Sequence, residues 1–93
     1  MRWRLFATLG EAVGTNEVSV PTERENPTLR DAVDALMETQ PELEALVLDE
    51  HGELQSHITL LYDGTDPFRE ADGWETPVAD DRELALFPPV TGG

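Results

Sequence analysis

Four short stretches of the chain alternate between apolar and polar residues, and this period of two predicts β-strands. They are residues 2–9, 17–21, 57–62 and 83–87. Residues 10–16 hold two glycines, so we expect a turn there that joins the first two strands as a hairpin. The side chains expected on the buried side of the sheet are those of Trp3, Leu5, Ala7, Leu9, Val18, Val20, Ile58, Leu60, Tyr62, Leu84 and Leu86.

A longer stretch has the spacing of an amphipathic helix. Thr28 is placed to cap its start, with Asp31 three residues later as in a capping box. Pro41 ends it, because the residue before a proline is biased away from helical geometry. Residues 42–48 are expected to form a second short helical turn. The buried stripe of the main helix comprises Leu29, Val33, Leu36 and Met37, with Ala32 beside it.

Residues 65–82 show no regular period and contain Pro67, Gly73 and Pro77. The segment is long for a structureless loop, so we expect its large apolar side chains to pin it to the core. The order of strands, helix and further strands indicates an α+β domain with one main helix across one face of a sheet. The expected anchors are Phe68, Trp74 and Val78.

The charge of the chain excludes several kinds of partner. Twenty Asp and Glu residues stand against six Arg and no Lys, for a net charge of −14. Nucleic acid and anionic membranes attract basic surfaces, so neither is an expected ligand. An acid-rich, lysine-free surface suits a high-salt cytoplasm, where charges are screened over about 3 Å near 1 M salt. The other interpretation is a mesophilic protein steered by its charge to a basic partner.

The chain has no apolar run long enough to span a membrane, and Arg4 interrupts any signal-peptide pattern. We therefore expect a soluble cytoplasmic protein. The absence of Cys excludes disulfides, thiolate metal sites and a Cys nucleophile. His51 with Asp49, Glu50 and Glu53 lacks the spacing of a metal site, and residues 63–66 lack the later ligands of a calcium loop. No metal and no cofactor is expected.

The end of the chain resembles a known family. The ending Leu-Phe-Pro-Pro-Val-Thr-Gly-Gly over residues 86–93, with WRLFATL at 3–9 and DAVDAL at 31–36, is similar to the ubiquitin-like sulfur carriers and protein modifiers. The archaeal modifier proteins and the small subunit of molybdopterin synthase are the most similar members. The resemblance implies a β-grasp domain over residues 1–87, with a mixed sheet of four to five strands, and a flexible tail over 88–93. The longer 65–82 segment departs from the family pattern.

In this family the terminal carboxylate, here on Gly93, is the reacting group. The resemblance implies that an E1-like activating enzyme adenylates it with ATP, which makes the protein a monomeric substrate and carrier and not an enzyme. Gly92 and Gly93 lack a Cβ and can thread a narrow active site. Pro88 and Pro89 hold the tail extended, so less ordering entropy is lost on docking. The remaining tail residues are Val90 and Thr91.

Three apolar residues are expected on the sheet face that points away from the helix, namely Phe6, Leu61 and Phe87. The family fold places the first and last strands side by side, which would bring these residues together. An apolar cluster on so acidic a surface predicts a docking site for the activating enzyme. The alternative is that the 65–82 segment folds over the cluster and covers it.

Three functions remain open. The first is a modifier joined by an isopeptide bond to target lysines. The second is a sulfur carrier whose terminal thiocarboxylate serves molybdopterin synthesis by entering the large synthase subunit. The third is a non-covalent interaction module. Because the chain has no Lys, we predict that it is attached singly and forms no chains through its own side chains.

Overall fold

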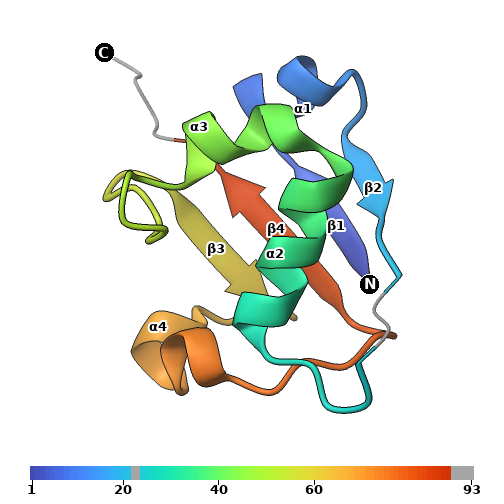
Figure 1. Cartoon of the computed structure of the whole chain (residues 1–93), viewed down its shortest axis with the longest axis vertical. Coiled ribbons are helices and arrows are strands. Elements are labelled where there is room, and N and C mark those ends of the chain that lie inside the picture. The colour runs from blue at the N-terminus through green and yellow to red at the C-terminus, as the bar shows by residue number, and fades with distance from the viewer. Residues whose placement is uncertain (22–23, 89–93) are drawn as a thin grey trace.

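A computed structural model describes residues 1–21 and 24–88 of the chain (Figure 1). Their four strands form one sheet in the order β2-β1-β4-β3. The strands are β1 (Arg2–Leu5), β2 (Glu17–Ser19), β3 (Thr59–Tyr62) and β4 (Glu83–Phe87). The antiparallel pairs β1–β2 and β3–β4 flank a central parallel pair, β1–β4. The mixed sheet predicted from the sequence is therefore present, and the last strand has the predicted bounds.

The parallel pairing of β1 and β4 sets the direction in which the chain leaves the sheet. Arg2 lies opposite Glu83 and Leu5 opposite Leu86. Phe6 continues the ladder, because its N–H donates to the Leu86 carbonyl at 3.2 Å. The end of β1 and the start of the tail thus lie side by side at the same end of the sheet.

The main helix α2 (Leu29–Thr39) crosses one face of the sheet (Figure 1). Its start is the predicted capping box: Thr28 accepts from the Asp31 N–H, and the Asp31 carboxylate accepts from the Thr28 N–H. The helix ends before Pro41, as predicted. The predicted stripe is buried against the sheet side chains, and the fully enclosed core comprises Trp3, Leu5, Leu9, Leu29, Val33, Leu36, Leu43, Val47, Leu60, Leu84 and Leu86.

The strand predicted over residues 2–9 is present only over Arg2–Leu5, and its antiparallel pairing with the second strand is confirmed. The prediction of strand over 6–9 and of a simple turn over 10–16 is wrong. β1 ends at Leu5, and residues 8–13 form a short helix, α1 (Thr8–Val13). Ala7 reverses the chain with φ 50°, so its side chain is exposed and does not face α2. Gly10 sits inside α1, where an added Cβ would lie 3.1 Å from the Leu5 carbonyl oxygen. The absence of a side chain at Gly10 permits this close contact between helix and strand. In the sequence, the same glycine suggested a turn.

The segment after α2 forms the predicted short helical turns, η1 (Pro41–Leu43) and α3 (Glu44–Val47). β3 begins at Thr59, two residues later than predicted, although Ile58 is buried. Asp63 and Gly64 both have positive φ, and Tyr62 and Thr65 exchange two backbone hydrogen bonds across them. This is the geometry of a two-residue type I′ turn, as the Asp-Gly sequence predicts.

The segment predicted to be irregular contains α4 (Pro67–Glu70) and η2 (Gly73–Glu75). Trp74 anchors it: the Arg30 guanidinium lies 3.9 Å from the Trp74 ring centroid, and the indole N–H donates to Glu53 at 2.7 Å. Val78 is buried as predicted. Phe68 is 40% exposed and packs edge-on against Trp74, so it anchors the segment only through that ring.

Among the described residues, no helix has the length and apolar character needed to cross a membrane.

The terminal ammonium of Met1 donates to the Val20 carbonyl and to the Asp80 carboxylate, each at 2.8 Å. These two bonds tie the start of β1 to β2 and to the approach to β4.

Candidate functional site

The sheet has one face covered by helices and one open face. α1, α2 and α3 lie on the same side of the sheet (Figure 1). Side chains alternate along each strand, so those that do not enter the core point to the other side. We call this side the open face. Its strand residues and the adjoining Phe6 are Arg2, Arg4, Phe6, Glu17, Ser19, Thr59, Leu61, Glu83, Ala85 and Phe87.

Two aromatic rings form the apolar centre of the open face. The rings of Phe6 and Phe87 stack with centroids 4.3 Å apart and planes inclined by 12°. Both residues are half-buried. We call them the aromatic pair. Such a stack contributes about 0.5–1.5 kcal/mol beyond its buried area, and it holds both rings in a fixed orientation.

Leu61, the third predicted member, lies on the same face but one step away. The β3–β4 register places it opposite Ala85, so it is diagonal to Phe87. Thr59 is the residue directly opposite Phe87. The structure therefore brings Phe6 and Phe87 into contact and puts Leu61 at the edge of the same surface.

The 65–82 segment does not cover the aromatic pair. α4 packs against η2 and β3, and η2 packs against α2. In Figure 1, α4 lies at the end of β3 that is remote from α3 and from the end of β4. Phe6, Leu61 and Phe87 all keep part of their surface exposed.

The predicted tail begins at the aromatic pair. Phe87 is the last residue of β4, and the half-buried Pro88 follows it directly. The remaining tail residues lie outside the described part of the chain; they are Pro89, Val90, Thr91, Gly92 and Gly93. The division into a domain over 1–87 and a tail over 88–93 stays a prediction.

Arg4 is a neighbour of the aromatic pair that the sequence analysis did not identify. Its guanidinium carbon lies 5.6 Å from the Phe6 ring centroid, within the range of a cation–π contact. The signal was present in the sequence, because Arg4 and Phe6 are two residues apart on one strand and so share a face.

Two of the acidic residues that were rejected as metal ligands, Asp49 and Asp66, have structural roles. The Asp49 carboxylate accepts from the backbone N–H groups of Glu53 and His51, and these bonds lower the pKa of Asp49. Asp66 caps α4 by accepting from the Phe68 N–H. In the described part of the chain, no group of three or more acidic, His or Cys side chains is arranged to hold a metal ion.

Comparison with known proteins identifies the family. The profile of the ThiS family matches residues 3–93. The chain belongs to the ThiS family. It is 43% identical to small archaeal modifier protein 1 of Haloferax volcanii, over all of both chains. It is 32% identical to small archaeal modifier protein 3 of the same organism, over 97% of this chain and 95% of that protein.

The crystal structure of the first of these relatives superimposes on this ThiS-family chain with a TM-score of 0.87 at 41% identity, covering 100% of this chain and 98% of the other. The β-grasp fold implied by the sequence resemblance is thereby confirmed. The chain is homologous to a small ubiquitin-like modifier protein. The halophilic origin stays a prediction, which two relatives from Haloferax volcanii favour.

Proposed function

We propose that this ThiS-family protein is a ubiquitin-like modifier whose Gly93 carboxylate is activated and joined to lysines of other proteins. The carboxylate oxygen attacks the α-phosphate of ATP and pyrophosphate leaves, which gives an acyl-adenylate. A lysine amine then attacks the acyl carbon, AMP leaves and a proton is released. The protein supplies the acyl group, and an E1-like activating enzyme supplies the catalytic groups.

The observation that carries this proposal is the similarity to small archaeal modifier protein 1 over the whole of both chains. The match extends over the whole of this chain, including Gly92 and Gly93. The geometry adds a second support: the aromatic pair immediately precedes the tail. Six extended residues reach at most about 20 Å, so an enzyme that acts on Gly93 also lies within reach of Phe87.

Mass spectrometry of the protein and its conjugates tests the proposal. Cells that express the chain should contain other proteins with a Gly-Gly remnant on lysine after digestion, and removal of Gly92 and Gly93 should abolish these remnants. If conjugates are absent while the purified chain is adenylated by its organism's own activating enzyme, the isopeptide step is contradicted.

The aromatic pair gives a second prediction, the docking of the activating enzyme. Phe87→Asp places a charge in the centre of the open face, and we expect adenylation to be lost while the fold remains. Phe68→Asp is the control, because Phe68 is also a partly exposed phenylalanine but lies on α4, outside the strands of the open face. Normal adenylation of the Phe87→Asp variant, measured by pyrophosphate exchange, would exclude this docking site.

A sulfur carrier is the second candidate, because Leu-Phe-Pro-Pro-Val at residues 86–90 is equally typical of molybdopterin carriers. It uses the same acyl-adenylate, which a sulfide donor converts into a thiocarboxylate while AMP leaves. The large subunit of molybdopterin synthase would then receive the tail. The intact mass separates this fate from conjugation, since the free protein gains the difference between a sulfur and an oxygen atom.

A non-covalent interaction module is the third candidate, and it needs no reactive tail. The Gly92–Gly93 deletion distinguishes it from the other two, because binding through the open face would survive the deletion and acyl transfer would not.

A further inference from the structure

The two edge strands of the sheet, β3 and β2, differ in how far their outer backbone groups are covered. Beside β3, Thr65 exchanges two backbone hydrogen bonds with Tyr62, and α4 packs against the strand. Leu60 is the other residue of β3 whose N–H and C=O point away from β4, and it is only 1% exposed. The outer edge of β3 is therefore closed.

The outer edge of β2 is open at Ser19. Met1 and Val20 exchange two hydrogen bonds of 2.8 Å across the antiparallel pair of β1 and β2. The residue next to such a pair directs its N–H and C=O to the other side of the strand. Ser19 is exposed, and these two groups make no hydrogen bond within the described part of the chain. The corresponding groups of Glu17 bond only the Thr15 hydroxyl, at 3.2 and 3.3 Å.

A groove of about 460 Å³ lies between α2 and the chain just after β2. Its apolar part is formed by one valine and one alanine. Its charged part holds three carboxylates and one guanidinium, a net charge of −2. The residues that provide these groups are Val20, Ala35, Arg24, Asp31, Asp34 and Glu38.

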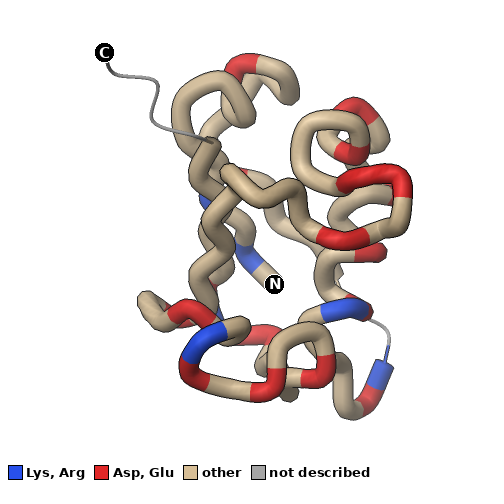
Figure 2. Tube along the Cα trace, turned by 90° about the vertical axis from the view of Figure 1, so that its left-hand side faces the viewer, with Lys and Arg blue, Asp and Glu red and all other residues tan. Residues whose placement is uncertain are grey.

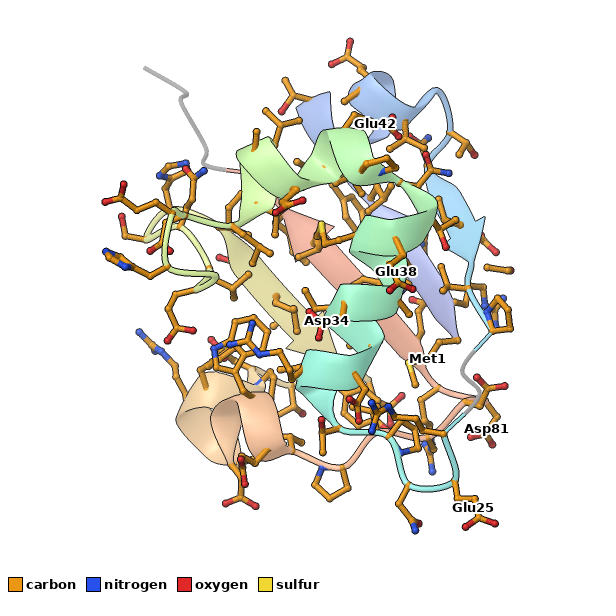
Figure 3. The ribbon with its side chains drawn as sticks, viewed as in Figure 1. Met1, Glu25, Asp34, Glu38, Glu42 and Asp81 are labelled. Carbon is orange, nitrogen blue, oxygen red and sulfur yellow. The ribbon has the colours of Figure 1, made fainter. Side chains whose placement is uncertain are left out.

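Two carboxylates of this groove have no partner. Arg24 approaches Asp31 at 3.5 Å, whereas Asp34 and Glu38 are exposed and make no ion pair or hydrogen bond among residues 1–21 and 24–88. Figure 2 shows acidic positions on many helices and loops, so charge alone does not distinguish this groove. Figure 3 shows Asp34 and Glu38 following each other along α2. Like charges four residues apart on a helix repel, and a bound cation would relieve that repulsion.

We propose that the outer edge of β2 and the groove beside it bind an extended basic segment of a partner protein. The segment adds to the sheet as an antiparallel strand, the slightly more stable pairing, and exchanges backbone hydrogen bonds with Ser19. Strand addition takes its affinity from main-chain bonds and its specificity from alternate side chains. The positive charge follows from complementarity with Asp34 and Glu38.

The geometry of the sheet sets the spacing of the positive charges. The residue that pairs with Ser19 has its side chain on the open face, so the residues before and after it point to the side of α2. Two side chains that are two residues apart on a strand are separated by about 7 Å. Asp34 and Glu38 are separated by about 6 Å along the helix axis. The segment should therefore carry Lys or Arg at every second position.

This site lies away from the tail and goes beyond the proposed function. Ser19 is opposite Arg2 at the start of β1, whereas the tail follows the far end of β4. The strand β1 also separates β2 from β4. A partner bound beside β2 therefore leaves Gly93 accessible, and the protein can be bound and attached at the same time.

The charges argue against other occupants. Two copies of this chain joined along β2 would bring two rows of α2 carboxylates together, and nucleic acid would be repelled. A metal ion or a polyamine has no peptide backbone to exchange hydrogen bonds with Ser19. An extended basic peptide satisfies both the open edge and the unpaired carboxylates.

Titration of the labelled full chain with acetyl-Lys-Val-Lys-Val-Lys-amide, followed by amide chemical shifts, tests the inference. We expect the shifts to centre on Glu17, Ser19 and Ala35. The matched peptide with Pro in place of both Val keeps the charges but lacks the N–H groups that face Ser19, and it should bind about tenfold more weakly. A peptide with Glu in place of Lys should not bind.

Variants of the protein test the two halves of the site separately. Asp34→Asn combined with Glu38→Gln should weaken binding of the lysine peptide about tenfold. Glu50→Gln combined with Glu70→Gln is the matched control, because both residues are exposed and lie on the β3 side of the molecule (Figure 1). The control should leave the affinity unchanged.

Ser19→Pro removes the outward N–H without removing a bond to β1, and it should abolish binding of the lysine peptide. Chemical unfolding checks that each variant is folded, and the two charge variants test the site even if Ser19→Pro does not fold. Equal affinities for the lysine peptides with Val and with Pro, or equal effects of the two charge variants, would show attraction by net charge alone and overturn the inference.

Shifts centred on the aromatic pair would also overturn it, and so would a wild-type dimer in sedimentation that Ser19→Pro dissociates. None of these measurements requires ATP or a reactive Gly93. Failure of adenylation therefore contradicts only the proposed function, and failure of peptide binding contradicts only the site beside β2.

Discussion

The backbone of Ala7 is the least ordinary feature of the chain at the scale of single residues. Its φ of 50° and ψ of −125° lie in a region that favours glycine. The conformation turns the chain from β1 into α1 directly after Phe6, so it fixes where that ring leaves the strand. The aromatic pair thus stands beside a strained residue, a combination that is common at functional sites.

Ala7→Gly should stabilise the protein. Relief of the strained φ contributes on the order of 1–3 kcal/mol, and the extra freedom of glycine in the unfolded chain removes roughly 0.4–1 kcal/mol of it. Ala12→Gly, inside α1, is the control, and we expect it to lower stability by about 1 kcal/mol. Denaturant unfolding measures both; if Ala7→Gly destabilises the protein as much as Ala12→Gly does, Ala7 is not strained.

At the scale of elements, the capping box at the start of α2 makes the stability of the protein depend on pH. The Thr28 N–H and hydroxyl bonds, and the nearby Arg24, lower the pKa of Asp31 below its usual value of 3.8. A carboxylate whose pKa is lower in the folded than in the unfolded protein stabilises the fold at every pH above its unfolded pKa. This contribution to stability is lost as the pH falls through the folded pKa.

Asp31→Asn should therefore be less stable than the wild type at neutral pH, because the amide keeps the shape of the capping box without its charge. This difference in the free energy of unfolding should close as the pH falls from the usual value of 3.8 through the lower pKa of folded Asp31. Asp34→Asn, on the exposed side of the same helix, is the control, because Asp34 lies outside the capping box. Thermal unfolding across this pH range measures it, and a gap that persists in acid would contradict the role of the charge.

The elements that the sequence predicted well are those whose signals are local. The stripe and cap of α2 and the alternation in β4 each depend on neighbours within a few residues. α1 was missed because Leu5, Ala7 and Leu9 alternate like a strand while Gly10 suggests a turn. The close approach of Leu5, Thr15 and Asn16 to Gly10 explains that glycine, and these contacts require the folded chain.

The candidate site was predictable for a similar reason, and only in part. Phe6 and Phe87 were assigned to one face by strand alternation, and the family resemblance supplied the parallel pairing that brings them together. The contacts that anchor the 65–82 segment were harder to predict from the sequence, because Arg30, Glu53 and Trp74 are far apart in the chain. Arg4 was accessible from the sequence, because strand alternation places it on the same face as Phe6, but its contact with that ring was not predicted.

At the scale of the whole molecule, the lysine-free composition limits what a modifier can become after attachment. No side chain offers an ε-amine. The Met1 ammonium donates to the Val20 carbonyl and to Asp80, so attack by its nitrogen first requires the loss of two hydrogen bonds and a proton. Because the chain has no lysine, none of its side chains can accept an isopeptide bond.

We therefore expect single attachments only. Arg69→Lys gives a matched gain-of-function variant, because it adds one amine at an exposed position and keeps the charge. Mass spectrometry of conjugates should find no Gly-Gly remnant within the wild-type chain, whereas the Arg69→Lys variant should be open to modification at that position. A ladder of linked wild-type copies would contradict the expectation. If neither protein is extended, access to the conjugating enzyme, and not the missing amine, limits chain growth.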